Sequence, residues 1–384
     1  MFDKSAHLFP VKKTYAYLSH CSISPLYGKA AEQGAAVLTA QSEQGILGNL
    51  EHKGVLEELR SHLSRILLTH PDNVSFVKNT SEGMGMIANG YPFQPGDEVI
   101  SYIHEYPANH YPWKLQESHG VKVRLLPNRD VSGGTTQGRP CGWSIEDLKE
   151  ALSPKTKLVA LSHVQFSSGF AADLYEVGAL CRERGIDLVV DAAQSLGCLP
   201  ISPEECHIAA MVASGWKWLL GPVGTGLMYT SPSFRERLCH VLTGAELMCQ
   251  DADYLNHTWD PHACSRRFEY STSHVALAAS LEVCLREIQG RYTVPAIRDE
   301  TFRLQDLLRQ GLDPERYTAV AYPEKHRSGI LSVICRRREP EEVQSLLADK
   351  GVIASARSGY LRLAPFFYNT ESEIERALAA LHAL

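Results

Sequence analysis

Short apolar segments alternate with helical patterns through the middle of this chain, and that alternation restricts the possible folds more than any other feature. Strands are expected at residues 98–103, 121–126, 157–162, 186–190, 208–214 and 226–229, and helices at 144–152 and 173–184. Residues 188–190 belong to an almost continuous apolar run, which is typical of parallel strands that helices cover on both faces. The alternation therefore predicts an α/β fold with a largely parallel sheet.

After about residue 290 the pattern becomes that of a smaller unit. Helices are expected at 297–310, at 341–350 and from residue 371 onward, with strands near 330–335 and 360–363. This arrangement indicates a small α+β domain at the C-terminal end. We predict a large domain over residues 14–289 and a small domain made of residues 1–13 and 290–384, although no Pro-, Gly- or Ser-rich linker marks the boundary.

Composition excludes several classes of function. The 384 residues include 38 Lys and Arg against 44 Asp and Glu, a net charge of −6 that does not suggest a nucleic-acid partner or a polybasic membrane surface. No stretch approaches the ~18 uninterrupted apolar residues of a membrane span, and residues 1–14 lack the apolar core of a signal peptide. The ten cysteines include no C-x-x-C pair, which favours the reducing cytoplasm. No metal site is predicted, because His104 and His110 do not have H-E-x-x-H spacing.

Two residues next to predicted strand ends are candidates for chemistry. Asp191 follows strand 186–190, and ligands of parallel sheets bind beyond the carboxyl ends of the strands, although this residue could also cap the next turn. Lys217 follows strand 208–214 and stands between Trp216 and Trp218. Apolar neighbours lower the pKa of a lysine and make its amine available for Schiff-base chemistry. The alternative is a surface lysine whose stem lies against the two rings.

Asp191, Lys217 and the glycine-rich segment 221–226 together resemble the pyridoxal-phosphate enzymes of fold type I. The resemblance is closest to the class V aminotransferase family, which includes cysteine desulfurases, selenocysteine lyases and isopenicillin-N-epimerase-like proteins. It extends over nearly the whole chain and rests on several spaced motifs. It implies pyridoxal 5′-phosphate as cofactor, a large domain with a mainly parallel seven-stranded sheet flanked by helices, and a homodimer.

Further motifs carry the family's cofactor-binding roles onto this chain. Residues 79–83 resemble the N-T-[ST]-E-[GA] motif, which would assign the cofactor phosphate to Ser81 first and Thr80 second; the same residue types also form a simple helix cap. Residues 104–113 resemble E-[HYF]-x-A-N-x-x-P-W, so Tyr106 would stack on the pyridine ring. The resemblance also implies that Asp191 pairs with the pyridine nitrogen and that Gln194 contacts the phenolic oxygen. It assigns a phosphate contact to Ser214 and the Schiff base to Lys217.

Three other segments match the family's substrate and interface regions. Residues 17–25 resemble its active-site entry segment, where His20 and Cys21 would lie beside the substrate. Thr272 ends a segment similar to R-F-E-x-G-T, in which the threonine reaches the phosphate held by the partner subunit. Arg362 aligns with the arginine that binds the α-carboxylate of the substrate, whereas without the family it would be interpreted as a rim salt bridge. The loop near the cofactor lacks the asparagine of some relatives, which leaves three alternatives, Gln165, Ser167 and Ser168.

The resemblance implies an enzyme that acts on an α-amino acid through an external aldimine, with Lys217 as the catalytic base. The leading hypothesis is an aminotransferase or a C–S or C–Se lyase. An epimerase or a specialised biosynthetic enzyme is an alternative, and a catalytically idle scaffold protein is another. We expect no persulfide route, because residues 357–362 contain no cysteine and are too few to form a mobile loop. Cys21 remains an alternative nucleophile, unless it is simply a small buried residue.

Overall fold

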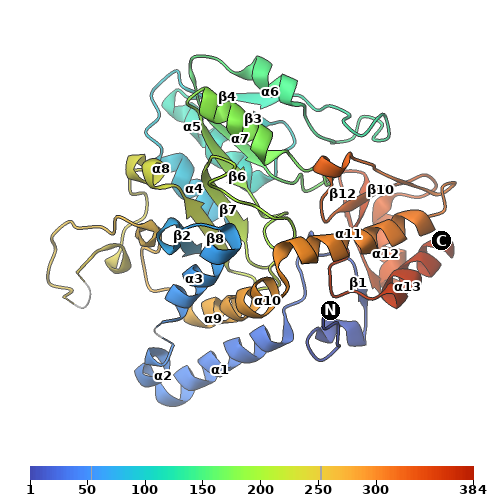
Figure 1. Cartoon of the computed structure of the whole chain (residues 1–384), viewed down its shortest axis with the longest axis horizontal. Helices are drawn as coiled ribbons and strands as arrows, with labels where there is room; N and C mark the ends of the chain where they lie inside the picture. The colour runs from blue at the N-terminus through green and yellow to red at the C-terminus, as the bar shows by residue number, and fades with distance from the viewer. Residues whose placement is uncertain (53, 251–252) are drawn as a thin grey trace.

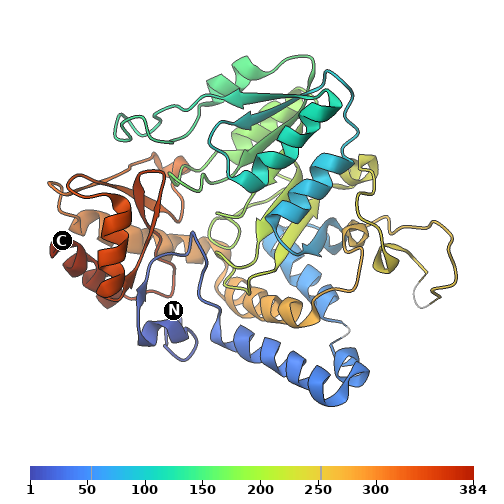
Figure 2. The same cartoon turned by 180° about the vertical axis from the view of Figure 1, so that it is seen from behind.

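The structure of the chain is a computed structural model that describes residues 1–52, 54–250 and 253–384. A large central sheet lies between helices, and a smaller sheet packs beside it at the side of the molecule where both termini lie (Figures 1 and 2). Among the described residues, no helix is both long enough and apolar enough to cross a membrane. The same described part of the chain holds no cluster of three or more His, Cys, Asp or Glu side chains that could bind a metal ion.

The large sheet has seven strands in the order β2-β8-β7-β6-β5-β3-β4. Every neighbouring pair is parallel except the two pairs that involve β8, which runs antiparallel to both β7 and β2. The strands are β2 (Val74–Val77), β3 (Glu98–Tyr102), β4 (Lys122–Leu126), β5 (Thr156–Ser162), β6 (Asp187–Asp191), β7 (Ile208–Ser214) and β8 (Gly226–Thr230). The predicted mainly parallel, seven-stranded sheet is therefore confirmed.

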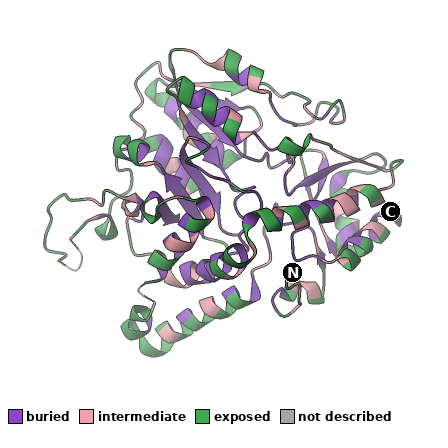
Figure 3. Cartoon of the chain, viewed as in Figure 1, coloured by how far each residue is buried: buried purple, intermediate pink, exposed green. Residues whose placement is uncertain are grey.

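Helices cover both faces of this sheet, so nearly all residues of its interior strands β5, β6 and β7 are buried (Figure 3). Within β5, Val159 and Leu161 face one apolar cluster while Leu158 and Ala160 face the other, as the two-residue period of a strand requires. The first cluster includes residues of α1 (Gly28–Gln44), α3 (Val55–Leu67), α7 (Leu174–Glu183) and α9 (Val275–Cys284). The second includes residues of α4 (Thr80–Gly90), α5 (Tyr111–Gln116) and α8 (Pro232–Arg237). Two further helices of this unit are α2 (Ile46–Leu50) and α6 (Ile145–Ala151).

The smaller sheet is antiparallel, with the order β12-β13-β10-β9. Its strands are β9 (Tyr317–Ala319), β10 (Leu331–Cys335), β12 (Ser355–Arg357) and β13 (Tyr360–Leu363). Its apolar cluster is completed by α11 (Val294–Gly311), α12 (Pro340–Asp349) and α13 (Glu371–His382). Just before α11, Thr293 has a φ of 60°, which breaks the helical path that ends with α10 (Gly290–Tyr292). The domain boundary at residue 290 stays a prediction, and this break lies close to it.

The first part of the chain contacts both units. Leu8 and Phe9 belong to an apolar cluster of the large unit, whereas Ala16 and Leu18 belong to that of the small unit. Strand β1 (Ala16–Tyr17) pairs in parallel with β11 (Val352–Ile353). This segment therefore links the two units.

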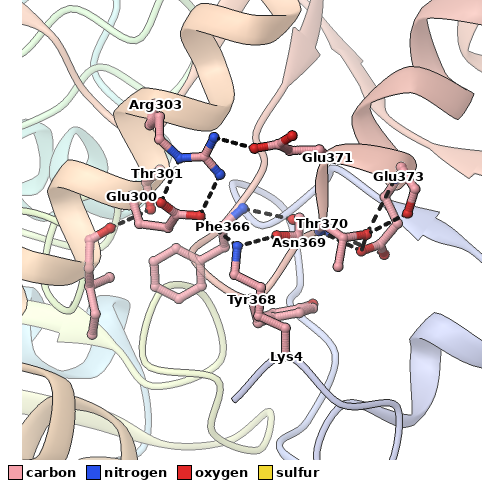
Figure 4. Close-up of polar contacts among 12 residues, drawn as sticks. Lys4, Glu300, Thr301, Arg303, Phe366, Tyr368, Asn369, Thr370, Glu371 and Glu373 are labelled. Carbon is pink, nitrogen blue, oxygen red and sulfur yellow. Dashed lines mark hydrogen bonds and ion pairs between the residues drawn. The ribbon is translucent and has the colours of Figure 1, made fainter. Parts of the chain in front are cut away.

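Charged side chains hold the N-terminal segment against the C-terminal part of the chain (Figure 4). The Nζ atom of Lys4 donates to Glu300 Oε1 at 2.5 Å and to the carbonyl oxygen of Asn369 at 2.7 Å. Arg303 binds both Glu300 and Glu371, which joins α11 to the start of α13. The contacts of Lys4 hold the N-terminal segment in place, and the entry segment at residues 17–25 follows it along the chain.

Candidate active site

A cavity of about 590 Å³ lies at the carboxyl ends of β5, β6 and β7, beside the start of α4. This is the edge of the sheet at which α/β proteins bind ligands. Nine of the eleven predicted site residues line it, namely Cys21, Thr80, Ser81, Tyr106, Asp191, Gln194, Ser214, Lys217 and Arg362. His20 and Thr272 do not line it. The structure thus brings together residues that lie as much as 341 positions apart (362 − 21).

Lys217 follows β7 by three residues, and its amine lies 5.5 Å from the centre of the Tyr106 ring. Burial lowers the pKa of Lys217, and the nearby charge of Arg362 lowers it further, while Asp191 and Cys21 act in the opposite direction. The two neighbouring tryptophans have different positions, because Trp216 lines the cavity and Trp218 is fully buried in the core. A lysine with a lowered pKa beside a flat ring fits the formation of a Schiff base.

Asp191 is the last residue of β6, and only 4% of its surface is exposed. Its Oδ1 atom accepts a hydrogen bond from the backbone amide of Ala193 at 2.8 Å. Asp191 therefore also caps the turn that follows β6, which is the alternative role expected from the sequence. Burial raises the pKa of the Asp191 carboxyl, whereas the amide of Ala193 and the charge of Lys217 lower it. The carboxyl therefore lies at the base of the cavity, where a cationic ring nitrogen would stabilise its charged form.

Glu105 is a buried carboxyl beside this group that the sequence analysis did not single out. It accepts hydrogen bonds from the Ser162 amide at 2.9 Å, from the Ser162 hydroxyl and from Gln165 Nε2 at 2.9 Å. Burial raises the pKa of Glu105 to about 7, against the lowering effect of these donors, and the charge of Asp191 raises it further. Glu105 does not line the cavity, but it fixes Ser162, which does.

The start of α4 forms a place for an anion. Asn79 caps the helix, because its side-chain oxygen accepts from the Glu82 amide at 2.8 Å. The amides of the first turn have no partners within a helix, and the positive end of the helix dipole favours a negative group there. Across the cavity, the Ser214 hydroxyl is buried and makes no hydrogen bond to any described residue. Gly226 allows this close packing, because a Cβ atom there would lie 3.0 Å from the backbone of Asn79.

Gln194 connects the cavity to the entry segment. Its Nε2 atom donates to the carbonyl oxygen of Cys21 at 2.8 Å, and its Oε1 atom accepts from the indole nitrogen of Trp218 at 3.2 Å. One amide hydrogen of Gln194 is left for a ligand oxygen. The Cys21 thiol also lines the cavity, and its Sγ atom lies 3.5 Å from the hydroxyl oxygen of Ser355.

Arg362 in β13 is only 2% exposed, and it has no ion pair with any described residue. One terminal nitrogen donates to the carbonyl oxygen of Phe166, and the other donates to the Ser22 hydroxyl at 3.1 Å. Its Nε atom is buried without a partner among the described residues. Since a guanidinium has five N–H donors, three of them remain for a ligand, which suits a carboxylate.

The loop after β5 does not place its polar residues as predicted. None of Gln165, Ser167 and Ser168 lines the cavity; its walls there are Ser162, Val164 and Phe166. For Gln165 the physical reason is the alternation of an extended chain, which directs Ser162, Val164 and Phe166 to one side, whereas Ser167 and Ser168 lie in the turn that follows. The three polar residues instead make internal contacts: Gln165 bonds to Glu105, Ser168 donates to the carbonyl oxygen of Cys141, and the Ser167 carbonyl oxygen accepts from Ser332.

His20 lies in the core beneath the cavity. Its Nδ1 atom lies 2.7 Å from the carbonyl oxygen of Ala364, which can only accept, so this nitrogen carries the proton. Burial lowers the pKa of His20 to about 4, so the ring is neutral and its Nε2 atom accepts from the Tyr368 hydroxyl at 2.8 Å. His20 thus anchors the entry segment. Thr272 is exposed on the surface of the chain.

The residues present fit pyridoxal phosphate. Lys217 offers an amine of lowered pKa, and Asp191 offers a buried carboxyl for a pyridine nitrogen. The unpartnered Ser214 hydroxyl and the start of α4 offer donors for a phosphate. Tyr106 offers a flat face above the amine.

Known proteins similar to this chain include enzymes of a pyridoxal-phosphate family, in agreement with the cavity residues that fit this cofactor. The family model of aminotransferase class V matches residues 39–376. A probable cysteine desulfurase from Methanothermobacter thermautotrophicus is 25% identical over 338 residues, which cover 83% of this chain and 81% of that protein. The uncharacterized aminotransferase YcbU from Bacillus subtilis is 25% identical over 394 residues, which cover 99% of this chain and 97% of that protein.

Solved structures share the fold. The cystine C-S lyase C-DES, in complex with its product cysteine persulfide, matches with a TM-score of 0.88 and 22% identity over 97% of this chain and 98% of that chain. A mutant of C-DES with glycine covalently linked to its PLP cofactor has a TM-score of 0.89 at 22% identity, covering 98% of both chains. The cysteine desulfurase CsdA from Escherichia coli has a TM-score of 0.85 at 20% identity, covering 100% of this chain and 98% of that chain. With its family match, its fold and its cavity, this chain belongs to the class V aminotransferase family and is a pyridoxal-phosphate-dependent enzyme of fold type I.

Proposed function

We propose that this enzyme acts on an α-amino acid as a class V aminotransferase or as a C–S or C–Se lyase that uses no persulfide cysteine. The observation that carries the second part of this proposal is the connection between β12 and β13. Only Ser358 and Gly359 join the two strands, with φ angles of 51° and 79°. These values suit a type I′ hairpin turn, which is the tightest connection that two antiparallel strands accept.

This hairpin is also held from outside. The Nε atom of Arg139 donates to the carbonyl oxygen of Gly359 at 3.0 Å, and the hydroxyl of Tyr360 donates to the carbonyl oxygen of Pro140 at 2.9 Å. A cysteine that accepts sulfur from a substrate and passes it on must move between the active site and the acceptor. A two-residue turn fixed by these bonds has neither the length nor the freedom for such movement.

Neither Cys335 nor Cys21 offers an evident replacement. Burial raises the pKa of Cys335 in β10 to about 12, so its thiol is a poor nucleophile at neutral pH. Cys21 lines the cavity, but it lies on the entry segment that His20 anchors in the core. Its backbone carbonyl oxygen is further tied to Gln194. A persulfide on Cys21 could not leave the cavity without breaking these contacts.

The chain's own groups have separable tasks in such a reaction. Arg362 binds the substrate carboxylate and thereby orients Cα toward Lys217. The Lys217 amine, whose pKa burial lowers, takes the proton from Cα as a general base. Asp191 keeps a proton on the pyridine nitrogen. The cofactor supplies, when bound, the electron sink for the charge that develops at Cα.

We also propose that the working form is a homodimer in the cytoplasm. Thr272 is exposed and lies outside the cavity of its own chain, as expected for a residue that serves the site of a partner subunit. The described residues form no disulfide, which is consistent with a reducing compartment.

The test is to incubate the holoenzyme with a panel of amino acids and to measure oxo acid, sulfide or selenide, ammonia and inverted substrate. Oxo acid together with the aminated cofactor would identify an aminotransferase, and released sulfide or selenide would identify a lyase. Intact-protein mass spectrometry after incubation with cysteine, without reductant, should show no persulfide. A persulfide that disappears together with turnover when Cys21 is replaced by Ser would refute the proposal. Inverted substrate alone would favour the epimerase alternative, and no product from any amino acid would favour the idle scaffold.

A further inference from the structure

A second arginine stands at the mouth of the cavity. Arg357 is the last residue of β12 and lines the cavity together with Arg362 of the adjacent strand β13. In the antiparallel register, Arg357 lies opposite Tyr360, and Arg362 lies opposite Ser355. The two arginines therefore come from the two strands of the same fixed hairpin.

The charge of the cavity lining is unbalanced. Its cationic side chains are Lys217, Arg357 and Arg362, and its acidic side chain is Asp191. When Lys217 is joined to the cofactor and the α-carboxylate of a substrate lies on Arg362, the charge of Arg357 has no counterpart among these groups. Burial lowers the pKa of Arg362, and the charge of Arg357 contributes to that lowering, so the two guanidinium groups are close enough to repel each other.

The guanidinium of Arg357 is available for a ligand. Its Nη1 atom makes a long hydrogen bond of 3.4 Å to the carbonyl oxygen of Ala356, and no ion pair joins the guanidinium to any described residue. Exposed arginines elsewhere in the structure show the contrast: Arg303 binds Glu300 and Glu371, and Arg237 binds Asp187 through two nitrogens. Arg357 is thus an unpaired cation whose backbone position the hairpin fixes.

We propose that Arg357 is a specificity-determining residue that binds a second anionic group of the substrate. The preferred substrates are then α-amino acids whose side chain ends in a carboxylate or a sulfur oxyanion. This inference rests on the proposed function, in that Arg362 holds the α-carboxylate. A fork of N–H donors near the side-chain end of the substrate distinguishes an anion from its neutral isostere, because only the anion accepts charge-assisted hydrogen bonds.

The phosphate of the cofactor is a less suitable partner for Arg357. The groups that fit a phosphate lie on the large unit, at the start of α4 and at Ser214, the last residue of β7. Arg357 lies instead on the small sheet, beside the arginine that fits the substrate. Its place is therefore on the substrate side of the cavity.

The experiment compares pairs of nearly isosteric ligands on the holoenzyme. Dissociation constants for aspartate and asparagine, and for glutamate and glutamine, are measured from the change in cofactor absorbance. Calorimetry with succinate and with butyrate gives a second readout that needs no amino group. The acidic member of at least one amino-acid pair should bind more tightly, and Arg357→Gln should reduce that preference at least fivefold, since one charge-assisted hydrogen bond is worth about that much or more.

Two further variants complete the test. Arg357→Lys keeps the charge but loses the fork, so it should retain part of the preference for the anion. Arg337→Gln removes a different exposed arginine of the small unit, one that pairs with Glu315 outside the cavity, and should leave the preference unchanged. Equal affinity for acid and amide in the wild type, or a preference that Arg357→Gln does not alter, would overturn the inference. If no amino acid changes the cofactor absorbance while succinate still binds through Arg357, the proposed function fails but the anion site stands.

Discussion

Replacing Arg362 by Ala should remove the principal binding group for the substrate carboxylate. The side chain is 2% exposed, and it is flanked by the carbonyl oxygen of Phe166 and by the Ser22 hydroxyl, which hold its plane. Because these two contacts use two of its five donors, the other three, including the unpartnered Nε–H, are available to the substrate. The guanidinium is therefore oriented before the substrate arrives, and little ordering entropy is lost on binding.

The expected effect follows from the strength of a charge-assisted hydrogen bond. One such bond contributes about 1.5 to 3 kcal/mol, and a second, parallel bond raises the total to about 4 kcal/mol. At about 1.4 kcal/mol per decade, Arg362→Ala should raise the KM for a good amino-acid substrate by about one to three decades. The visible absorbance of the cofactor should persist, because Lys217 and Asp191 are unchanged.

The assay is steady-state turnover over a wide range of substrate concentration, with cofactor occupancy measured by absorbance on the same samples. Arg362→Gln is the matched control, since its amide can still donate to Phe166 but carries no charge. If the guanidinium acts through its charge, both variants lose substrate affinity alike. Unchanged substrate saturation in Arg362→Ala would refute the assignment, and recovery of affinity in Arg362→Gln would show that the side chain acts only by supporting Phe166.

Three other predictions concern the cofactor, the buried carboxyl and the assembly. Borohydride reduction of the holoenzyme followed by peptide mapping should find the label on Lys217, and a label on another lysine would overturn the site. The pKa of Glu105 is raised from 4.5 to about 7, so its contribution to stability is complete below pH 4.5 and falls by up to about 3 kcal/mol as the pH rises through 7. Denaturant titrations should show this fall in the wild type relative to Glu105→Gln, and parallel pH profiles would contradict it. Sedimentation equilibrium should show a dimer, and Thr272→Ala should weaken cofactor retention; a monomer with full activity at nanomolar concentration would exclude the shared site.

The large sheet could be predicted from the sequence because its strands are short, apolar and separated by helical segments. The six strands expected there agree with the structure to within one residue at each end, and the strand from Ile208 to Ser214 agrees at both ends. The seventh, β2, was not singled out, because four apolar or small residues show too little of any period. The predicted strand ends locate Asp191 and Lys217 at the edge of the sheet without knowledge of tertiary contacts, and both line the cavity there.

Residues whose role depends on a distant partner could not be predicted in this way. His20 was expected beside the substrate, but Tyr368, 348 positions away, holds it in the core. Glu105 is not among the predicted site residues, because nothing in its own segment shows that Ser162 and Gln165 donate hydrogen bonds to it. Phe166 is apolar and is not among the predicted polar contacts of that loop, yet the alternation of the chain after Ser162 directs Val164 and Phe166 toward the cavity. That alternation was the one available signal.

The link between the two ends of the chain also constrains how the protein is made. Phe9 stacks on Tyr368 with ring centres 3.9 Å apart, and β1 pairs with β11 across more than three hundred residues. During synthesis the large sheet has all its strands once residue 230 has left the ribosome, but β1 and His20 lack their partners until β11 and Tyr368 emerge. Contacts of such long sequence separation form late, because the entropy of closing the loop must be overcome first. The wall of the cavity that carries Arg362 is therefore assembled last, and a nascent chain should offer no complete site for the substrate carboxylate until its C-terminal segment has emerged.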